Sequence, residues 1–410
     1  MNRVAITGVG IISCLGTDNE TVAQRLYRGQ SAIEVDPERA ALGFRSPLTT
    51  RIAGFDAARY LHRKARKTMT DFAVQAYAAA VDAIRDARLA PEDLQNERTG
   101  LVFGCDSSCL AAIEQVDLVR RHKSTGAIGS GHVFCSMTSN ITMNLNALLK
   151  TRGACWTLSA ACSSGGHAIG QAADLIRLGR QDRVICGGAQ ELNWQSMCSF
   201  DALDAFSTRV SAPHEACRPF DASRDGLVPG GGAAALVLER YDLAQNRRVP
   251  ILGEVVGYGF SSDGANISVP SEGGLLRAMA SALLEAALAV EDVDYICAHA
   301  TGTPVGDGVE AVGIHRLFGD ACHPGVASLK GMVGHELWMA GAAQVVYCVL
   351  MARNGFTAAS VNFERPDPYS AKLRILTDRL DRPPRIVLCN SAGFGGTNAC
   401  LALRLTPDGQ

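Results

Sequence analysis

The chain has 410 residues, of which 47% are hydrophobic and 20% are charged, and its formal net charge is −2. This apolar content is enough to build large buried cores, which excludes a disordered chain. A net charge this close to zero argues against a nucleic-acid-binding protein, because such a protein needs a basic face. The longest apolar runs are far shorter than the roughly 20 residues that span a bilayer, so we expect no membrane insertion.

The 14 cysteines include no CxxC pair. This spacing gives no support to a zinc knuckle or a thioredoxin-like centre. Many of the cysteines lie in apolar surroundings, as Cys186, Cys297, Cys389 and Cys400 do. We interpret these as small core residues of a protein that stays in the reducing cytoplasm.

Short apolar runs, interpreted as buried strands, alternate with longer helical stretches along the chain. This alternation is typical of mostly parallel sheets covered by helices, which is an α/β fold. Strands are expected at residues 4–12, 100–103, 156–160, 184–186, 234–238, 295–298 and 386–389. Helices are expected at residues 69–88, 163–179 and 275–290.

The two halves of the chain resemble each other. A Gly-Val-Gly step in residues 3–12 has a Gly-Tyr-Gly counterpart in residues 251–260, and a glycine pair or triplet opens an apolar strand near both residue 232 and residue 396. A long-period duplication is the simplest explanation, and chance similarity between buried strands is the alternative. The polar stretch 242–250 marks the expected join, so we divide the chain into residues 1–245 and 246–410.

Cys162 stands at a predicted junction between a strand and a helix, among small residues. A thiol at the N-terminus of a helix experiences a positive potential, which lowers its pKa and favours the thiolate nucleophile. Small neighbours would also allow a substrate to approach the sulfur closely. A buried structural cysteine is the alternative interpretation.

Two histidines lie at the ends of predicted elements beside glycines. His299 follows a strand and opens a turn, and His335 precedes a helical stretch. Neither has a second ligand three or four residues away, so the sequence predicts no metal site. Taken singly, each histidine is more often structural than catalytic.

Residues 390–398 form a glycine-rich segment around Phe394. Glycines on both sides of this phenylalanine permit a tight loop with exposed backbone N–H groups, which can stabilise an oxyanion. The segment lacks the GxxxxGK[ST] pattern and is therefore not a phosphate loop.

Together these motifs resemble the condensing enzymes of the thiolase superfamily, and above all the elongating β-ketoacyl-[acyl-carrier-protein] synthases. The resemblance covers essentially the whole chain. Four motifs occur in the family's order: Ala161-Cys162-Ser163-Ser164, His299 with Thr301-Gly302-Thr303-Pro304, Lys330 with Gly334-His335, and Gly393-Phe394-Gly395-Gly396-Thr397-Asn398. The resemblance implies a duplicated, five-layered αβαβα fold with two mostly parallel or mixed sheets, usually in a dimer.

The resemblance also implies a role for each matching residue. Cys162 would hold an acyl chain as a thioester, while His299 and His335 would promote decarboxylation of a malonyl-thioester and stabilise the enolate. Lys330 would hold the local charge network, and Phe394 would cover the sulfur and share the oxyanion hole with Cys162. The implied substrate contacts are Thr301, Thr303, Ser107, Gly395 and Gly396. No metal or other cofactor is implied, because the phosphopantetheine of an acyl carrier protein carries the substrates.

The sequence departs from the family after the second histidine. Glu336, Trp338 and Met339 stand where Ser, Gly and Ala are usual, and Gln344 stands where a glutamate linked to the lysine is common. These changes put the Lys330 network in doubt. Ser107 is smaller than the residue of some relatives, so we expect a longer or more polar acyl chain to fit. The departures point to a specialised pathway, such as aryl-polyene or polyketide synthesis, rather than to housekeeping lipid synthesis.

Two short basic runs match carrier-facing regions of the family, and carrier proteins are acidic. The implied carrier contacts are Arg63, Lys64, Lys67, Arg121 and Lys123. We therefore predict an acyltransferase that forms a homodimer, or a heterodimer with a related ketosynthase or chain-length-factor subunit. The alternatives are a non-catalytic chain-length partner, which typically lacks the cysteine, and a coenzyme A thiolase, which uses a second cysteine. A cysteine hydrolase is a remote third.

Overall fold

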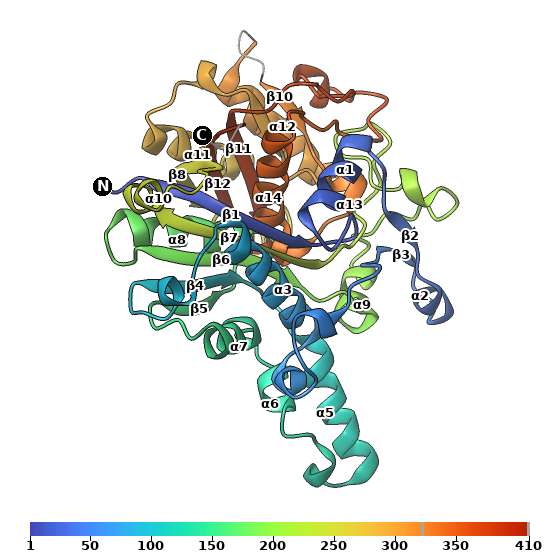
Figure 1. The fold of residues 1–410 in the computed structure, drawn as a ribbon. Coiled ribbons are helices and arrows are strands. Elements are labelled where there is room, and N and C mark those ends of the chain that lie inside the picture. The colour runs from blue at the N-terminus through green and yellow to red at the C-terminus, as the bar shows by residue number, and fades with distance from the viewer. Residues whose placement is uncertain (321–323, 408–410) are drawn as a thin grey trace.

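The computed structural model describes residues 1–320 and 324–407. Ten of its strands form one sheet, in the order β10-β9-β11-β12-β8-β1-β7-β6-β4-β5 (Figure 1). The first half contributes β1 (Val4–Ile12), β4 (Thr99–Gly104), β5 (Cys155–Leu158), β6 (Arg183–Gln190) and β7 (Gly232–Arg240). The second half contributes β8 (Gly253–Ser262), β9 (Tyr295–Cys297), β10 (Gly325–Ala327), β11 (Ile386–Gly393) and β12 (Thr397–Leu405).

Each half has the same topology. Counted within its own half, each set of strands has the order third, second, fourth, fifth, first. The second strand pairs in parallel with the third and the fourth, whereas the fifth pairs antiparallel with the fourth and the first, in both halves. This correspondence confirms the predicted duplicated fold, and the sheets are mixed rather than mostly parallel.

The two five-stranded units join at a short edge contact between β1 and β8. Only Ala5 with Glu254 and Ile6 with Gly253 pair there, antiparallel. The connection between the halves includes a helix, α10 (Tyr241–Arg247), at the place where the sequence predicted a polar join.

Helices cover both units and fill the space between them (Figure 1). Helix α3 lies on β1 and β7, α8 and α14 lie between the two units, and α11 lies on β8 and β12 with α12 against it. These helices are α3 (Asp71–Asp86), α8 (Ser164–Arg177), α11 (Gly274–Ala286), α12 (Pro304–Phe318) and α14 (Ala340–Arg353). The order helix, sheet, helix, sheet, helix is the predicted five-layered arrangement.

The repeated glycine steps have a packing function. A Cβ on Gly10 would collide with the carbonyl oxygen of Ala79 in α3, and a Cβ on Gly259 would collide with that of Ala278 in α11. Each outer helix therefore rests directly on the backbone of the first strand of its half. The similarity between the Gly-Val-Gly and Gly-Tyr-Gly steps thus reflects one packing solution used twice.

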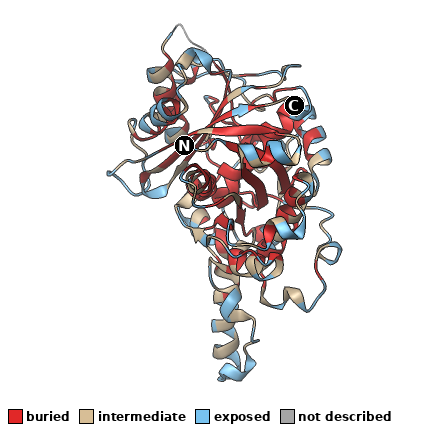
Figure 2. Ribbon diagram, turned by 60° about the vertical axis from the view of Figure 1, so that its left-hand side comes forward, coloured by how far each residue is buried: buried red, intermediate tan, exposed pale blue. Residues whose placement is uncertain are grey.

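An arm projects from the body of the molecule (Figures 1 and 2). It consists of α5 (Cys109–His122), a 3₁₀ turn η3 (Thr125–Ala127) and α6 (His132–Cys135). Ala111 is the only buried residue of α5. Among residues 1–320 and 324–407, no helix is long and apolar enough to cross a membrane.

The remaining helices and strands are smaller or peripheral. They are α1 (Asn19–Arg28), β2 (Ile33–Val35), α2 (Pro37–Ala41), β3 (Leu48–Thr50), α4 (Pro91–Leu94), α7 (Asn140–Leu149), α9 (Trp194–Ala202) and α13 (Lys330–Val333). The 3₁₀ turns used below are η2 (Ala65–Thr68), η4 (Ala161–Ser163), η7 (Leu337–Met339) and η9 (Phe394–Gly396).

Candidate active site

Cys162 lies in the turn η4, between strand β5 and helix α8. The turn has a constrained backbone, because Ala161 adopts a left-handed φ of 47°. The hydroxyl of Ser164 accepts a hydrogen bond from the Ala160 amide at 2.8 Å and donates one to the Ala161 carbonyl at 2.6 Å. A carboxylate oxygen of Asp106, beyond the end of β4, accepts from the Ala161 amide at 3.0 Å. Two side chains therefore hold the cysteine turn in place.

Cys162 is 6% exposed. Burial raises its pKa to about 12, and the positive charge of Lys330 opposes that rise. The predicted lowering of this pKa is therefore wrong, because desolvation of the enclosed sulfur outweighs the stabilisation of a thiolate. The glycines after the cysteine were expected to give a substrate access to the sulfur, and they also have a packing function. A Cβ on Gly165 would lie only 2.9 Å from the amide nitrogen of Ala342 in α14, so glycine here allows α8 and α14 to pack closely.

The two predicted histidines meet. His299 follows β9 and His335 follows α13, and their ring centroids lie 5.2 Å apart at an interplanar angle of 86°. Burial lowers the pKa of both imidazoles well below the ordinary value, and the charge of Lys330 lowers it further. Both rings are therefore neutral at physiological pH and can act as N–H donors.

Two buried carboxylates from α12 hold the loop that carries His299. Glu310 accepts hydrogen bonds from the amides of His299 at 2.9 Å and Ala300 at 2.6 Å. Asp307 accepts from the Thr301 amide at 3.0 Å, and burial raises its pKa to about 7. Sequence reasoning missed both acids. The sequence did carry a signal for them. Asp307 and Glu310 are three residues apart on a helix that starts at Pro304, and this spacing places both on the helix side that faces the His299 loop.

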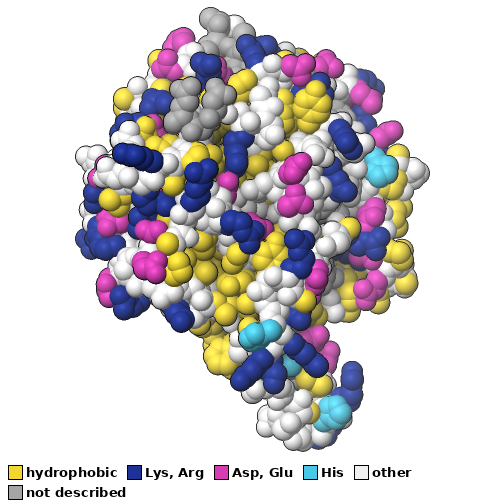
Figure 3. Space-filling view, viewed as in Figure 1, with side chains coloured by type: hydrophobic (Ala, Val, Ile, Leu, Met, Phe, Trp, Pro, Cys, Tyr) yellow, Lys and Arg dark blue, Asp and Glu magenta, His cyan; other side chains and the backbone are white. Residues whose placement is uncertain are grey.

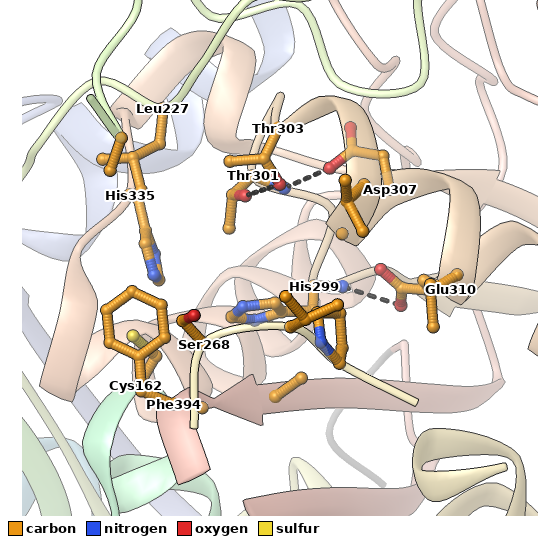
Figure 4. Close-up of a pocket in the computed structure, with 18 of the residues that line it drawn as sticks. Cys162, Leu227, Ser268, His299, Thr301, Thr303, Asp307, Glu310, His335 and Phe394 are labelled. Carbon is orange, nitrogen blue, oxygen red and sulfur yellow. Dashed lines mark hydrogen bonds between the residues drawn. The ribbon is translucent and has the colours of Figure 1, made fainter. Parts of the chain in front are cut away.

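The glycine-rich segment forms a tight corner between β11 and β12. Gly395 and Gly396 both have left-handed φ angles, 77° and 71°. The amide of Gly395 donates to the Ile267 carbonyl at 2.7 Å, which ties the corner to the loop of residues 263–271. Phe394 is 37% exposed, stacks on Phe200 at a centroid distance of 6.1 Å, and stands beside Cys162 (Figure 4).

These groups line one cavity of about 430 Å³ (Figure 4). The first half supplies Cys162, and the second half supplies the two histidines. Of the predicted residues, the cavity lining includes Cys162, His299, His335, Thr301, Thr303, Phe394 and Gly396. The hydroxyls of Thr301 and Thr303 lie 3.1 Å apart. Gly395, Lys330 and Ser107 do not line the cavity.

The two parts of the chain match the two domains of one family. Residues 1–244 match the β-ketoacyl synthase N-terminal domain, and residues 252–364 match the β-ketoacyl synthase C-terminal domain. The chain belongs to the β-ketoacyl synthase family. The predicted family and the predicted class of C–C-forming acyltransferase are thereby confirmed, and the synthase is favoured over the chain-length partner and the thiolase.

Relatives of this synthase share its whole length. It is 40% identical over 407 residues to 3-oxoacyl-[acyl-carrier-protein] synthase 1 of Haemophilus influenzae, covering 98% of this chain and 99% of that protein. A crystal structure of a β-ketoacyl synthase from Burkholderia phymatum superposes with a TM-score of 0.93 at 33% identity, covering 99% of this chain and 100% of that one. The ishigamide ketosynthase/chain length factor superposes with a TM-score of 0.92 at 29% identity, covering 99% of each chain.

Lys330 of this synthase is 3% exposed and begins α13. Among the residues that the structure describes, no carboxylate lies within 4 Å of its ammonium group. Gln344 donates from its side-chain nitrogen to the carbonyls of Cys297 at 3.1 Å and Ala298 at 3.0 Å. Gln344 therefore holds the end of β9 and does not bind the lysine, which justifies the doubt about the Lys330 network.

Ser107 is part of a chain of hydrogen bonds that the sequence did not reveal. Its hydroxyl donates to Glu191 at 3.0 Å and accepts from the indole N–H of Trp338 at 3.0 Å. Trp338 is 7% exposed and belongs to the same apolar cluster as Cys162. The indole therefore fills space beside Ser107, contrary to the predicted room for a longer acyl chain.

The five predicted carrier contacts are exposed and lie outside the cavity lining. Arg63, Lys64 and Lys67 lie in and before the turn η2, which packs on α6, whereas Arg121 and Lys123 end α5. Figure 3 shows Lys, Arg and His side chains gathered over the arm. Both basic runs thus belong to the region around the arm.

Proposed function

We propose that this synthase lengthens an acyl chain by a decarboxylative condensation with a malonyl group, using Cys162 as the nucleophile. The observation that carries this proposal is the single cavity that Cys162 shares with the neutral pair His299 and His335. A nucleophile splits the two-substrate reaction into an acyl transfer and a condensation. Two neutral N–H donors suit a reaction in which negative charge develops on a thioester oxygen.

In the first step the Cys162 sulfur attacks the carbonyl carbon of a carrier-bound acyl thioester. The bond from that carbon to the pantetheine sulfur breaks, and the proton of Cys162 passes to the departing sulfur. The amides of Cys162 and Phe394 stabilise the intermediate oxyanion. Lys330 assists because its charge favours the thiolate of an otherwise strongly desolvated cysteine.

In the second step a malonyl-thioester loses its carboxylate as carbon dioxide. The electron pair of the broken carbon–carbon bond forms an enolate, whose oxygen accepts hydrogen bonds from His299 and His335. The enolate carbon then bonds to the Cys162 thioester carbon, the bond from that carbon to sulfur breaks, and the thiolate regains a proton from solvent. Glu310 and Asp307 keep the His299 loop fixed during these steps.

The remaining predicted contacts have supporting roles. Thr301 and Thr303 bind the pantetheine, Gly396 belongs to the corner that the substrate passes, and Phe394 covers the sulfur between the two steps. This chemistry requires no metal or redox group, because the leaving carbon dioxide supplies the driving force and the carrier supplies the substrates. The two halves, residues 1–245 and 246–410, each contribute one side of the cavity.

We also propose partners and a compartment. An acidic acyl carrier protein binds the exposed basic runs around the arm, and the name of the Haemophilus influenzae relative includes such a carrier.

The partner in a dimer, a second copy or a related chain-length subunit, covers the edge strand β5 and the arm. Exposed apolar side chains gather there: Ile113, Val116, Val133, Phe134, Met137 and Trp156. An uncovered apolar edge strand would invite aggregation.

The cysteines among residues 1–320 and 324–407 are free thiols, which favours a reducing cytoplasm.

The experiment incubates the protein with carriers that bear saturated, unsaturated or aryl acyl chains and reads the adduct mass on Cys162. We expect an acyl adduct on the wild type and none on Cys162→Ala, while the exposed thiol of Cys198 reacts equally with iodoacetamide in both proteins. Acylation by unsaturated or aryl chains would place the enzyme in a specialised polyketide or aryl-polyene pathway, and acylation by saturated chains alone in fatty-acid synthesis. An adduct that persists in Cys162→Ala would refute the proposed nucleophile.

A further inference from the structure

Four polar side chains form a continuous chain of hydrogen bonds that ends at the cysteine turn η4. The hydroxyl of Tyr258 in β8 lies 2.6 Å from Nδ1 of His167 in α8, and Nε2 of His167 lies 2.9 Å from Oγ1 of Thr397 in β12. Oγ1 of Thr397 lies 3.1 Å from Oγ of Ser163, whose hydroxyl donates to the Ala160 carbonyl at 2.7 Å. None of these four side chains lines the cavity, so none touches the substrate there.

The chain links two segments that carry reacting groups. Ser163 directly follows Cys162, and Thr397 directly follows the corner η9, which begins with Phe394. The corner and the cysteine turn are in close contact, because a Cβ on Gly393 would lie 3.0 Å from the Cys162 amide nitrogen. These segments carry the two amides of the proposed oxyanion hole, those of Cys162 and Phe394.

One arrangement of the protons satisfies every group in this chain. A carbonyl oxygen can only accept, so the Ala160 carbonyl uses the single hydroxyl proton of Ser163. Thr397 must therefore donate to Ser163, and its oxygen accepts from Nε2–H of His167. A neutral imidazole that carries its proton on Nε2 accepts at Nδ1, where the Tyr258 hydroxyl donates.

The reverse arrangement fails at Tyr258. The Tyr258 hydroxyl would accept from His167, and its own proton would have no acceptor among the residues that the structure describes. Tyr258 is 6% exposed, and a buried O–H without an acceptor is unfavourable. Burial lowers the pKa of His167 to about 4 and raises the pKa of Tyr258, so near pH 7 the imidazole is neutral and the phenol keeps its proton. The hydrogen bonds therefore run from β8 toward the cysteine turn.

The corner depends on this chain for its connection to the nucleophile. On its other side, the Gly395 amide donates to the Ile267 carbonyl at 2.7 Å, and the Gly396 carbonyl accepts from the Asp263 amide at 2.9 Å. Both of these bonds tie the corner to the loop of residues 263–271. Within the part of the chain that the structure describes, the bond between Thr397 and Ser163 is the only hydrogen bond that joins residues 393–397 to residues 160–164.

We propose that His167 is a positioning residue for the oxyanion hole. Through Thr397 and Ser163 it holds the corner at a fixed distance from the cysteine turn. The amides of Cys162 and Phe394 are thereby directed at one oxygen atom. This inference deepens the proposed function and rests on it, because the oxyanion forms only when an acyl group is transferred to or from Cys162.

The test measures the carbonyl stretch of a ¹³C-labelled acyl group on Cys162 by isotope-edited infrared spectroscopy. A short acyl thioester without a carrier supplies this group. Hydrogen bonds in the oxyanion hole lower the stretching frequency, so Thr397→Val and His167→Phe should each move the band to higher wavenumber. The kcat of acyl transfer should fall about 10–100-fold at unchanged KM, because geometry and not a substrate contact is lost. Thr397→Ser keeps the hydroxyl and should restore most of both properties.

Two controls separate positioning from a general loss of stability. Thr357 is 3% exposed, donates to the Arg382 carbonyl at 2.8 Å and lies outside the cavity lining. Thr357→Val therefore removes a comparable buried hydroxyl and should leave the band and kcat unchanged. Nitrogen-15 NMR of labelled histidine tests the direction of the chain. The His167 signals, assigned by their loss in His167→Phe, should show a proton on Nε2 and none on Nδ1 at pH 7.

Three results would overturn the inference. They are an unchanged carbonyl band in Thr397→Val, an equal shift of the band in Thr357→Val, and a proton on Nδ1 of His167 in the wild type. Absence of an acyl adduct on wild-type Cys162 would instead refute the proposed function. Thermal unfolding of each variant monitors the fold. Should His167→Phe not fold, Thr397→Val and the NMR of the wild type still decide the question.

Discussion

Trp338 offers the sharpest test of how the cavity selects its acyl chain. It follows Leu337, which lines the cavity, and its ring centroid lies 6.2 Å from that of Phe200, another lining residue. The indole N–H donates to the Ser107 hydroxyl, which in turn donates to Glu191, and these two hydrogen bonds fix the indole in this position. A chain that extends from Cys162 toward Ser107 therefore meets the indole. We expect Trp338→Ala to shift the preference of the enzyme toward longer acyl chains.

The size of the effect follows from the volume of the indole. Its removal leaves a cavity on the order of 150 Å³, large enough for a group the size of benzene. The protein should lose about 3–5 kcal/mol of stability, as for other buried aromatic residues replaced by alanine. Each additional buried methylene contributes about 0.8 kcal/mol, so a chain two carbons longer gains about 1.6 kcal/mol, or about fifteenfold.

The assay measures the rate of acylation of Cys162 with carriers from butyryl to myristoyl, in the wild type, Trp338→Ala and Trp338→Phe. The phenylalanine variant is the matched control, because it keeps most of the ring but loses the hydrogen bond to Ser107. We expect it to shift the chain-length optimum less than the alanine variant does. An unchanged optimum in Trp338→Ala, with the expected loss of stability, would show that the acyl chain does not extend toward the indole.

Three further predictions concern the histidines, the acids of α12 and the carrier surface. His299→Ala and His335→Ala should each slow carbon dioxide release from a malonyl carrier by about 10²–10³-fold, and exchange for Asn should restore part of the rate because an N–H donor remains. Because both imidazole pKa values are strongly lowered, the wild-type rate should show no imidazole titration between about pH 6 and about pH 8. Asp307 has a raised pKa of about 7, so its contribution to stability is present below about pH 4 and is lost as pH rises through about 7. Urea unfolding at a series of pH values should show that loss, on the order of 4 kcal/mol, in the wild type and not in Asp307→Asn. The same dependence of the free energy of unfolding on pH in both proteins would contradict this prediction. Exchanging Lys64 and Lys67 for Glu should lower kcat/KM for carrier substrates and reduce the salt dependence of kcat/KM. A small thioester that lacks the carrier should react with the variant as it does with the wild type. Equal kcat/KM of variant and wild type for carrier substrates at low salt would exclude these lysines from docking.

Features governed by local pattern could be predicted from the sequence. The apolar run of β1 coincides with the expected strand at residues 4–12 because a strand buried on both faces needs continuous apolar residues. The junction before α8 was predictable because a short apolar run gives way there to a helical pattern, although β5 itself is exposed or half-buried. The convergence of Cys162 with the two histidines was predictable once the family order of the motifs was recognised. The short strand β10 (Gly325–Ala327) was missed, since three residues carry too little pattern.

Features that depend on partners distant in sequence could not be predicted. The hydroxyl of Ser107 meets an indole 231 residues away and a carboxylate 84 residues away. The basicity of Cys162 likewise depends on how completely the folded chain encloses its sulfur. A helix N-terminus contributes only locally, whereas burial is a property of the whole surrounding fold, so the sign of the pKa shift required the structure.

Backbone strain at the two sides of the cavity connects fold and chemistry. Ala161 precedes the nucleophile and Leu337 follows the segment of His335 and Glu336, and both adopt left-handed φ angles, 47° and 43°. Such conformations cost about 1–3 kcal/mol for residues other than glycine and persist only where neighbours enforce them. Ser164 and Asp106 enforce the first through three hydrogen bonds, and complete burial of the Leu337 side chain enforces the second. Because both strained residues flank reacting groups from opposite halves, the contacts that enforce these conformations also fix the positions of the sulfur and the imidazole before any substrate arrives.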